Sequence, residues 1–175
     1  MTLFTHQAQN QLKRDAPLAT RMRPRSFEEF VGQEHIVGTN KALRKSIQAN
    51  QTPSLILWGP PGSGKTTLAN LIAKVTKNHF SSISAVGSGV ADLRRIVTES
   101  KDRLGMNNQR TMLFIDEIHR FNKSQQDVIL PHVEDGTIVL IGATTENPSF
   151  EVISPLLSRA RVFTLKPIEE NQMGK

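Results

Sequence analysis

The nine residues from Gly59 to Thr67 match the phosphate-binding pattern G-x-x-x-x-G-K-[ST], known as Walker A. Glycines at this spacing let successive backbone N–H groups point at one anion, and the helix expected next adds its positive N-terminal end. Lys65 would place its charge on the β- and γ-phosphates, and the Thr66 hydroxyl would ligate Mg²⁺. We therefore expect a nucleotide site made of Gly59, Pro60, Pro61, Gly62, Ser63, Gly64, Lys65, Thr66 and Thr67.

Two adjacent carboxylates, Asp116 and Glu117, follow the apolar run 112–115 in a Walker B pattern. Asp116 can hold Mg²⁺, usually through water, and Glu117 would be the general base that orients and deprotonates the attacking water. A surface acidic pair is the alternative interpretation. His119 is expected to shape the following turn rather than to act chemically.

Polar and basic residues near the end of the sequence complete the candidate site. Thr144 would hydrogen-bond the γ-phosphate or the attacking water if its strand lies between the Walker A and Walker B strands. Thr145 and Asn147 are its competitors, and a turn that uses them for local backbone bonds is the alternative. Arg159, or else Arg161, would reach the γ-phosphate of a neighbouring subunit as an arginine finger, with a surface salt bridge as the alternative.

The elements that must position these residues follow from the hydrophobic pattern. Short apolar segments alternate with stretches of helical periodicity, which predicts an α/β fold with a five-stranded parallel sheet and helices on both faces. In such a sheet, ligands bind beyond the carboxyl ends of the strands. The expected strands are 54–58, 80–84, 111–115, 137–141 and 161–165; we also expect a helix over 40–50 capped by Asn40 and a loop over 105–109.

Composition limits the other possibilities. The 175 residues include no cysteine, which excludes disulfides, a thiolate nucleophile and cysteine metal sites. No apolar run is long enough to span a membrane and no signal peptide is evident, so a cytoplasmic protein is expected. The net charge is +6, and residues 1–25 hold five basic residues against one acidic residue. Such an arm can attract nucleic acid or an acidic partner, or simply be solvated.

The order of these motifs resembles the AAA+ ATPases, a class of P-loop NTPases with a RecA-like core, and within them the branch of clamp loaders and Holliday-junction motors. Residues 23–33 resemble the segment that wraps the adenine in that branch. By that resemblance Val31 and Gly32 would contact the base, with Pro17 and Ala19 nearby.

Four stretches resemble one narrower family, the bacterial replication-associated recombination protein A (RarA, also called MgsA), which is similar to the eukaryotic Werner-helicase-interacting protein. They are 17–24, 84–90, 116–127 and 142–150. The resemblance implies a DNA-dependent ATPase that uses ATP and Mg²⁺ in replication-fork maintenance, recombination and DNA repair. It also implies homo-oligomers, single-stranded DNA ends, gaps or forks, the single-stranded-DNA-binding protein as partner, and a nucleoid location.

Candidate DNA contacts are Arg94, Arg95, Arg120 and Lys123, which would bind phosphates independently of sequence; a solvated helix face is the alternative. A nucleotide-switched binding module and a Holliday-junction branch-migration motor are the alternative functions. The polar, basic sequence of residues 1–20 indicates a weakly ordered arm. By the resemblance, an AAA+ core (21–167) follows, and then the start of a linker (168–175) to a helical lid that this chain lacks. We therefore expect an N-terminal fragment with weak turnover of its own.

Overall fold

The computed structural model describes Pro17 and residues 22–170. Its centre is a five-stranded parallel sheet in the order β2-β3-β4-β1-β5, so β4 lies between the strands that precede Walker A and Walker B. The strands are β1 (Ser54–Trp58), β2 (His79–Ser84), β3 (Thr111–Asp116), β4 (Ile138–Thr144) and β5 (Ala160–Thr164).

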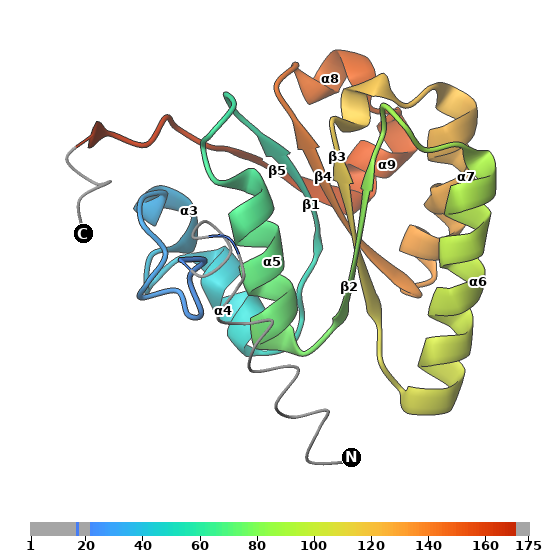
Figure 1. Cartoon of the computed structure of the whole chain (residues 1–175), viewed down its shortest axis with the longest axis horizontal. Helices are drawn as coiled ribbons and strands as arrows, with labels where there is room; N and C mark the ends of the chain where they lie inside the picture. The colour runs from blue at the N-terminus through green and yellow to red at the C-terminus, as the bar shows by residue number, and fades with distance from the viewer. Residues whose placement is uncertain (1–16, 18–21, 171–175) are drawn as a thin grey trace.

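Helices cover both faces of this sheet (Figure 1). One layer contains α3 (Glu34–Val37), α4 (Ala42–Gln48) and α5 (Lys65–Thr76). The other contains α6 (Val90–Asn107), α7 (Lys123–Glu134) and α9 (Ser154–Arg159), while the short turn η1 (Ile118–Arg120) and α8 (Pro148–Glu151) lie at the carboxyl edge of the strands. The α/β architecture and the parallel five-stranded sheet predicted from the sequence are therefore confirmed.

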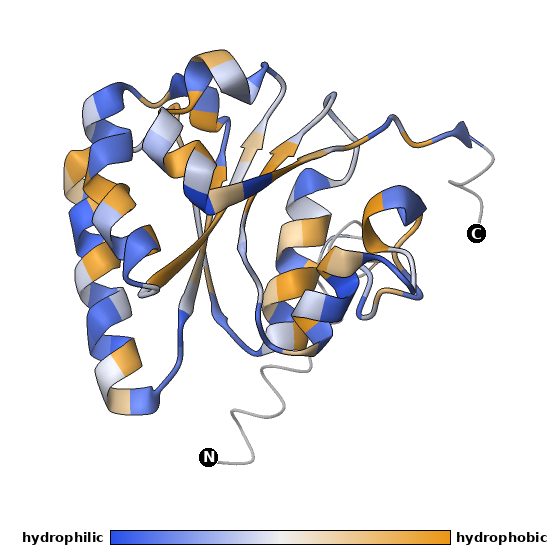
Figure 2. Ribbon diagram, turned by 180° about the vertical axis from the view of Figure 1, so that it is seen from behind, coloured by the Kyte–Doolittle hydropathy of each residue, from blue (hydrophilic) through white to orange (hydrophobic). Residues whose placement is uncertain are grey.

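Burial explains why the strands have the sequences they have. β4 is buried along its whole length and β3 everywhere except Asp116, which accounts for their almost uninterrupted apolar runs. The edge strands β2 and β5 are only partly buried and carry polar residues. Figure 2 shows the apolar centre of the sheet and the polar and apolar stripes of the helices that flank it.

Two local expectations were wrong. Gly105 was expected to open a loop, but α6 continues to Asn107 and ends at Asn108, whose φ is +49°. An exposed glycine only weakens a helix, and it did not end this one. Asn40 was expected to cap a helix; α4 instead begins after Lys41, with no side-chain cap.

Among the described residues, no helix combines the length and apolar character that a membrane crossing requires. Beyond β5, residues 165–170 run away from the sheet past α3 (Figure 1), and the described part of the chain contains no helical lid after β5. Ala19 and the rest of the arm other than Pro17 lie outside the described residues, as do 171–175.

Candidate nucleotide-binding and hydrolysis site

The phosphate loop connects β1 to α5, and backbone conformation sets its shape. Gly62 and Gly64 have φ values of +74° and +92°, which L-residues with side chains rarely adopt. Gly59 needs to be small for another reason, because a Cβ there would lie 2.8 Å from the Leu165 carbonyl oxygen. These positions explain three glycines of the motif and place the start of α5 at the loop, where its free N–H groups favour an anion.

Lys65 lies inside this loop. Its Nζ donates to the carbonyl oxygens of Gly59 and Pro60, both at 2.7 Å. Burial lowers the pKa of Lys65, and the charge of Asp116 opposes that shift. The lysine and the Walker B aspartate are thus close enough to interact, although they are 51 positions apart in the sequence.

Glu117 follows β3 in an unusual conformation. Its φ is +53°, in the left-handed region, and its backbone N–H donates to Asp116 Oδ1 at 3.0 Å. The Glu117 carboxylate lies 3.8 Å from Arg120 Nε, in a partly exposed ion pair. A non-glycine residue in this region costs of order 1–2 kcal/mol, a strain that often marks functional sites.

Thr144 ends β4 and lies beside the phosphate loop. It pairs with Trp58 in the parallel register, and its carbonyl oxygen accepts the Gly59 N–H at 3.1 Å. Thr144 is 1 % exposed, and its hydroxyl contacts His119 Nδ1 at 3.0 Å and the Glu146 backbone. The prediction that the strand ending at Thr144 lies between the two Walker strands is confirmed. Thr145 is exposed, and the Asn147 side chain caps α8 by accepting from Ser149 N.

Mg²⁺ fits this edge of the sheet only together with a nucleotide. Asp116 and Thr66 are both exposed there, and their oxygen atoms are hard donors that suit this ion. No group of three or more His, Cys, Asp or Glu among the described residues could hold a metal by itself. A site with so few protein ligands is the kind that Mg²⁺ occupies with phosphate oxygens and water.

Arg159 lies at the opposite edge of the sheet. It directly precedes β5, whose first residue, Ala160, pairs with Ser54 at the start of β1. Its guanidinium bonds Glu134 at 2.9 Å and the Pro155 carbonyl oxygen at 3.0 Å. Arg159 therefore does not share an edge with the phosphate loop of its own chain, and any contact with a γ-phosphate would involve another subunit's nucleotide. Arg161 is exposed one position into β5.

The segment expected at the adenine packs on the phosphate loop. Val31 is half-buried, Gly32 is buried with a φ of +80°, and the Phe30 ring lies 3.5 Å from the position of a Cβ on Gly64. Pro17 is exposed.

The comparisons with known proteins agree with this geometry. The sequence profile described as the Holliday junction DNA helicase RuvB P-loop domain matches residues 22–162. The chain belongs to this family. The solved structure of the Thermotoga maritima RuvB Holliday junction branch migration motor is 34% identical, with a TM-score of 0.66, over 82% of this chain and 48% of that one.

Two curated relatives are more similar to this chain in sequence than the RuvB structure is. Replication-associated recombination protein A of Haemophilus influenzae is 56% identical over 153 residues, which cover 87% of this chain and 34% of that protein. ATPase WRNIP1 of Dictyostelium discoideum is 47% identical over 158 residues, 90% of this chain and 18% of that protein. The similarity to the RarA family expected from the sequence is confirmed. It places the chain among the AAA+ P-loop ATPases of families named for replication and recombination. The chain spans about a third of the length of its bacterial relative.

One residue of this RuvB-like site was missed in the sequence. Gln33 is 5 % exposed, and its side-chain amide donates to the carbonyl oxygens of Ser63 (3.1 Å) and Lys166 (2.7 Å) and accepts from Lys166 N (3.0 Å). It thus ties the segment after β5 to the phosphate loop. Its position directly after Val31 and Gly32 was the only sequence signal.

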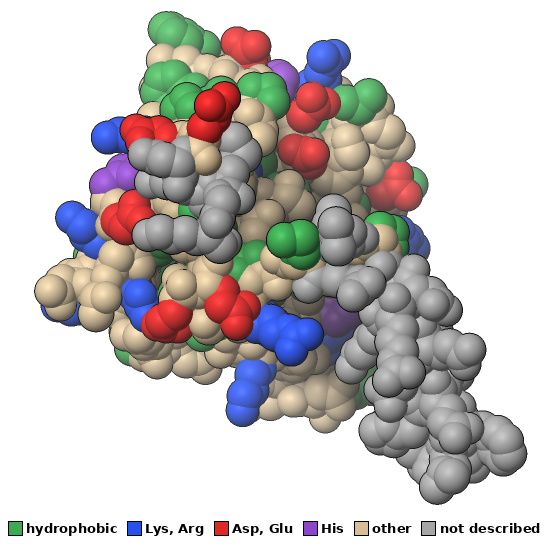
Figure 3. Space-filling view, turned by 60° about the vertical axis from the view of Figure 1, so that its left-hand side comes forward, with side chains coloured by type: hydrophobic (Ala, Val, Ile, Leu, Met, Phe, Trp, Pro, Cys, Tyr) green, Lys and Arg blue, Asp and Glu red, His purple; other side chains and the backbone are tan. Residues whose placement is uncertain are grey.

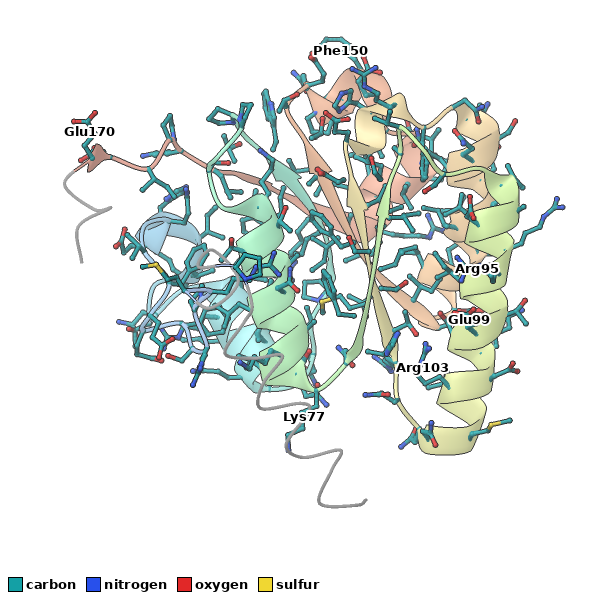
Figure 4. All side chains as sticks on the ribbon, in the orientation of Figure 1. Lys77, Arg95, Glu99, Arg103, Phe150 and Glu170 are labelled. Atoms are coloured by element: carbon teal, nitrogen blue, oxygen red, sulfur yellow. The ribbon has the colours of Figure 1, made fainter. Side chains whose placement is uncertain are left out.

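The candidate DNA contacts lie on the α6–α7 side of the molecule and are all exposed. Arg95 pairs with Glu99 one turn along α6 at 3.2 Å (Figure 4), and Arg120 pairs with Glu117. Figure 3 shows instead the side of the molecule that carries α3 and α4, where basic and acidic side chains are intermixed. Charge alone therefore does not single out a DNA surface on that face.

A separate polar pocket of about 630 Å³ lies at the amino ends of the strands, near Lys77 at the bottom of Figure 4. Half of its lining residues carry side-chain amides, the others are two threonines, Lys77, Arg110 and Val139, and none is a predicted site residue. The candidate nucleotide site is instead the open carboxyl edge where Lys65, Asp116 and Thr144 meet.

Proposed function

We propose that this chain is the ATP-binding core of a DNA-dependent ATPase of the clamp-loader-like AAA+ class. It would hydrolyse ATP to ADP and phosphate in replication-fork maintenance, recombination and DNA repair. The observation that carries the proposal is the strand order β3-β4-β1, which gathers Lys65, Asp116, Glu117 and Thr144 at one edge.

Each residue has a distinct role in this proposal. Lys65 binds the β- and γ-phosphates, and Thr66 with Asp116 would hold Mg²⁺, which supplies charge neutralisation on the phosphates when bound. Glu117 turns from Arg120 toward the attacking water and accepts its proton. Thr144 orients that water or the γ-phosphate. Since the contacts of Glu117 and Thr144 strengthen as charge develops in the transition state, their loss lowers turnover more than binding.

Completion of the site requires a second subunit. Arg159 lies away from its own phosphate loop, which favours its action in trans as an arginine finger, with Arg161 as the alternative. On this proposal Arg159 exchanges Glu134 for a neighbour's γ-phosphate, and the working form is a homo-oligomer. An isolated chain would then hydrolyse ATP slowly.

The DNA substrate is proposed from the relatives' names and from the basic side chains. Single-stranded ends, gaps or forks would bind through phosphate contacts with Arg94, Arg95, Arg120 and Lys123. The single-stranded-DNA-binding protein is the proposed partner, and the nucleoid in the cytoplasm is the proposed location. Branch migration is a second candidate because the family profile and the matched structures are those of RuvB.

The test measures nucleotide affinity and steady-state ATP turnover of this chain with no DNA, single-stranded DNA, forked DNA and a four-way junction. The Haemophilus relative at full length serves as a reference. Glu117→Gln should retain ATP binding and lose about 100-fold or more in turnover, and Glu151→Gln, an exposed glutamate on α8, should leave both unchanged. Unaltered turnover in Glu117→Gln would remove Glu117 from the mechanism.

The measurements with different DNA substrates distinguish the candidate functions. Stimulation by single strands and forks supports replication-fork maintenance, and stimulation by the four-way junction alone supports branch migration. ATP-dependent DNA binding that persists in Glu117→Gln with negligible wild-type turnover would support a nucleotide-switched module.

A further inference from the structure

His119 contacts the Thr144 hydroxyl, although the two residues are 25 positions apart. His119 lies in η1, two residues after Glu117, and Thr144 ends the neighbouring strand β4. The distance from His119 Nδ1 to Thr144 Oγ1 is 3.0 Å. One imidazole therefore connects the turn that presents the proposed base to the residue proposed to orient the attacking water.

The contact is held in place by the packing beneath it. Ile118, between Glu117 and His119, is fully buried and lies against β4 at Gly142. A Cβ on Gly142 would lie 2.9 Å from Ile118 Cδ1, so a larger residue there would force this buried side chain to shift. Burial of Ile118 against β4 thus anchors η1 beside the point where His119 contacts Thr144.

Three polar groups surround the Thr144 hydroxyl, as many as the hydrogen bonds that a hydroxyl can make. Its oxygen accepts from Glu146 N at 2.9 Å, and the Glu146 carbonyl oxygen (3.1 Å) and His119 Nδ1 (3.0 Å) are also within reach. A hydroxyl has one proton to donate and two lone pairs. If His119 Nδ1 carries a proton it donates to Thr144, and all three contacts are satisfied at once. If Nδ1 is bare, it competes with the Glu146 carbonyl for the single hydroxyl proton.

This competition matters for catalysis because a γ-phosphate oxygen can only accept a hydrogen bond from Thr144. A bare Nδ1 would draw the hydroxyl proton toward the ring. A protonated Nδ1 leaves that proton on the Glu146 side, from which a local movement of residues 145–146 can release it to phosphate.

We propose that His119 is a positioning residue whose Nδ1–H donates to Thr144 Oγ1, so that the Thr144 hydroxyl is kept as a donor for the γ-phosphate or the attacking water. It couples Thr144 to the turn that carries Glu117. The inference rests on the proposed ATPase function for its catalytic consequence, while the hydrogen bond itself can be tested without turnover.

The first test is spectroscopic. Long-range ¹H–¹⁵N correlation spectra identify which ring nitrogen of a histidine carries the proton, and they are recorded at about pH 8, where an ordinary imidazole is neutral. We expect protonated Nδ1 at His119 in the wild-type chain and a displaced Nδ1 resonance in Thr144→Val. A neutral ring with bare Nδ1 would overturn the proposal, because the hydroxyl would then donate to the ring.

The second test compares kinetic constants for ATP. His119→Leu should lower kcat about tenfold with KM changed less than about twofold, since positioning is lost and ground-state binding is kept. His119→Asn, whose amide nitrogen can occupy the place of Nδ1, should recover most of kcat, whereas His119→Gln, whose amide corresponds to Nε2, should not. His132→Leu, on α7 at the opposite edge, is the matched control.

A double variant decides whether the two side chains act together. His119→Leu combined with Thr144→Val should be no slower than Thr144→Val alone, because the second change removes an interaction already lost. Multiplicative losses would overturn the coupling. Turnover that survives Glu117→Gln would count against the proposed ATPase mechanism instead, and the spectra would then decide the His119 bond by themselves.

Discussion

The phosphate loop after β1 takes its shape from backbone conformation, whereas the turn after β3 takes its shape from side chains. In the loop, two glycines with positive φ and the Lys65 bonds to carbonyl oxygens fix the geometry. In the turn, Glu117 itself has a positive φ, and buried Ile118 and the His119–Thr144 bond hold it against β4. The loop takes most of its shape from nine consecutive residues, with Gln33 as a contact from outside them, while the turn depends mainly on contacts between separate segments.

This difference suggests how the two regions divide their work. The loop presents fixed N–H groups and one ammonium to an anion, which is a binding function. The turn presents the Glu117 carboxylate and, through His119, orients the Thr144 hydroxyl. The orientation of both groups depends on hydrogen bonds that can exchange partners. Such an arrangement suits a hydrolysis step that begins only when nucleotide or a second subunit binds. Changes in the loop should therefore act mainly on affinity, and changes in the turn mainly on turnover.

The largest effect is expected where the turn meets β4. Gly142→Ala would place a Cβ 2.9 Å from both Ile118 Cδ1 and Ile56 Cδ1. We expect a loss of about 1–3 kcal/mol in the free energy of unfolding from overpacking, and a fall of about tenfold or more in kcat as η1 shifts. Urea unfolding and steady-state kinetics measure the two effects, and KM for ATP should change little.

Gly105→Ala is the matched control for that substitution. Gly105 lies within α6, a Cβ there would have no atom within 4 Å, and its φ is negative. The alanine should raise stability by about 0.5–1 kcal/mol and leave kcat unchanged. A Gly142→Ala protein with wild-type stability and kcat would show that the close contact with Ile118 does not position the turn.

The comparison also explains what the sequence could predict. The loop, the strand that precedes it and the helix that follows are contiguous, so local pattern specified them. The role of Thr144 was predicted only on the condition that β4 lies beside both Walker strands, since strand order is a tertiary property. Gln33 joins Lys166 across 133 positions and His119 joins Thr144 across 25, and the sequence around these residues does not identify their distant partners.

A smaller effect is expected from loss of the hydrogen bonds by which the Gln33 side chain connects Ser63 of the phosphate loop to Lys166. Gln33→Leu keeps the volume and removes three hydrogen bonds, which leaves the Ser63 and Lys166 carbonyl oxygens without this partner. Unsatisfied buried groups cost about 1–3 kcal/mol each at most, and part of this cost will appear as a looser loop. We expect ATP affinity to fall about three- to tenfold with kcat within about twofold, measured by calorimetry and kinetics.

Gln48→Leu, at an exposed position on α4, controls for the added apolar side chain. If Gln33→Leu lowered kcat but left affinity intact, the proposed division between a binding loop and a catalytic turn would be wrong.

The smallest predicted effect concerns the proton on Lys65. Burial lowers the pKa of Lys65 in the free protein, and bound phosphates would raise it because they favour the charged ammonium. Between these two pKa values the free lysine is neutral and the bound lysine is charged, so ATP binding takes up a proton and affinity falls as pH rises through the lower pKa. Calorimetry at alkaline pH in two buffers of different ionisation enthalpy measures this uptake, which should be less than one proton.

Lys65→Arg separates this lysine from the other titrating groups, because arginine keeps its charge throughout the accessible pH range. The variant should bind ATP with no proton uptake from this position, even if its longer side chain lowers affinity. Equal uptake in the two proteins would assign the proton to another group, such as the nucleotide itself. Proton uptake seen only in the wild type would instead assign the proton to Lys65. It would show that the phosphate loop holds this lysine in a partly desolvated position, where bound phosphate favours its charged form.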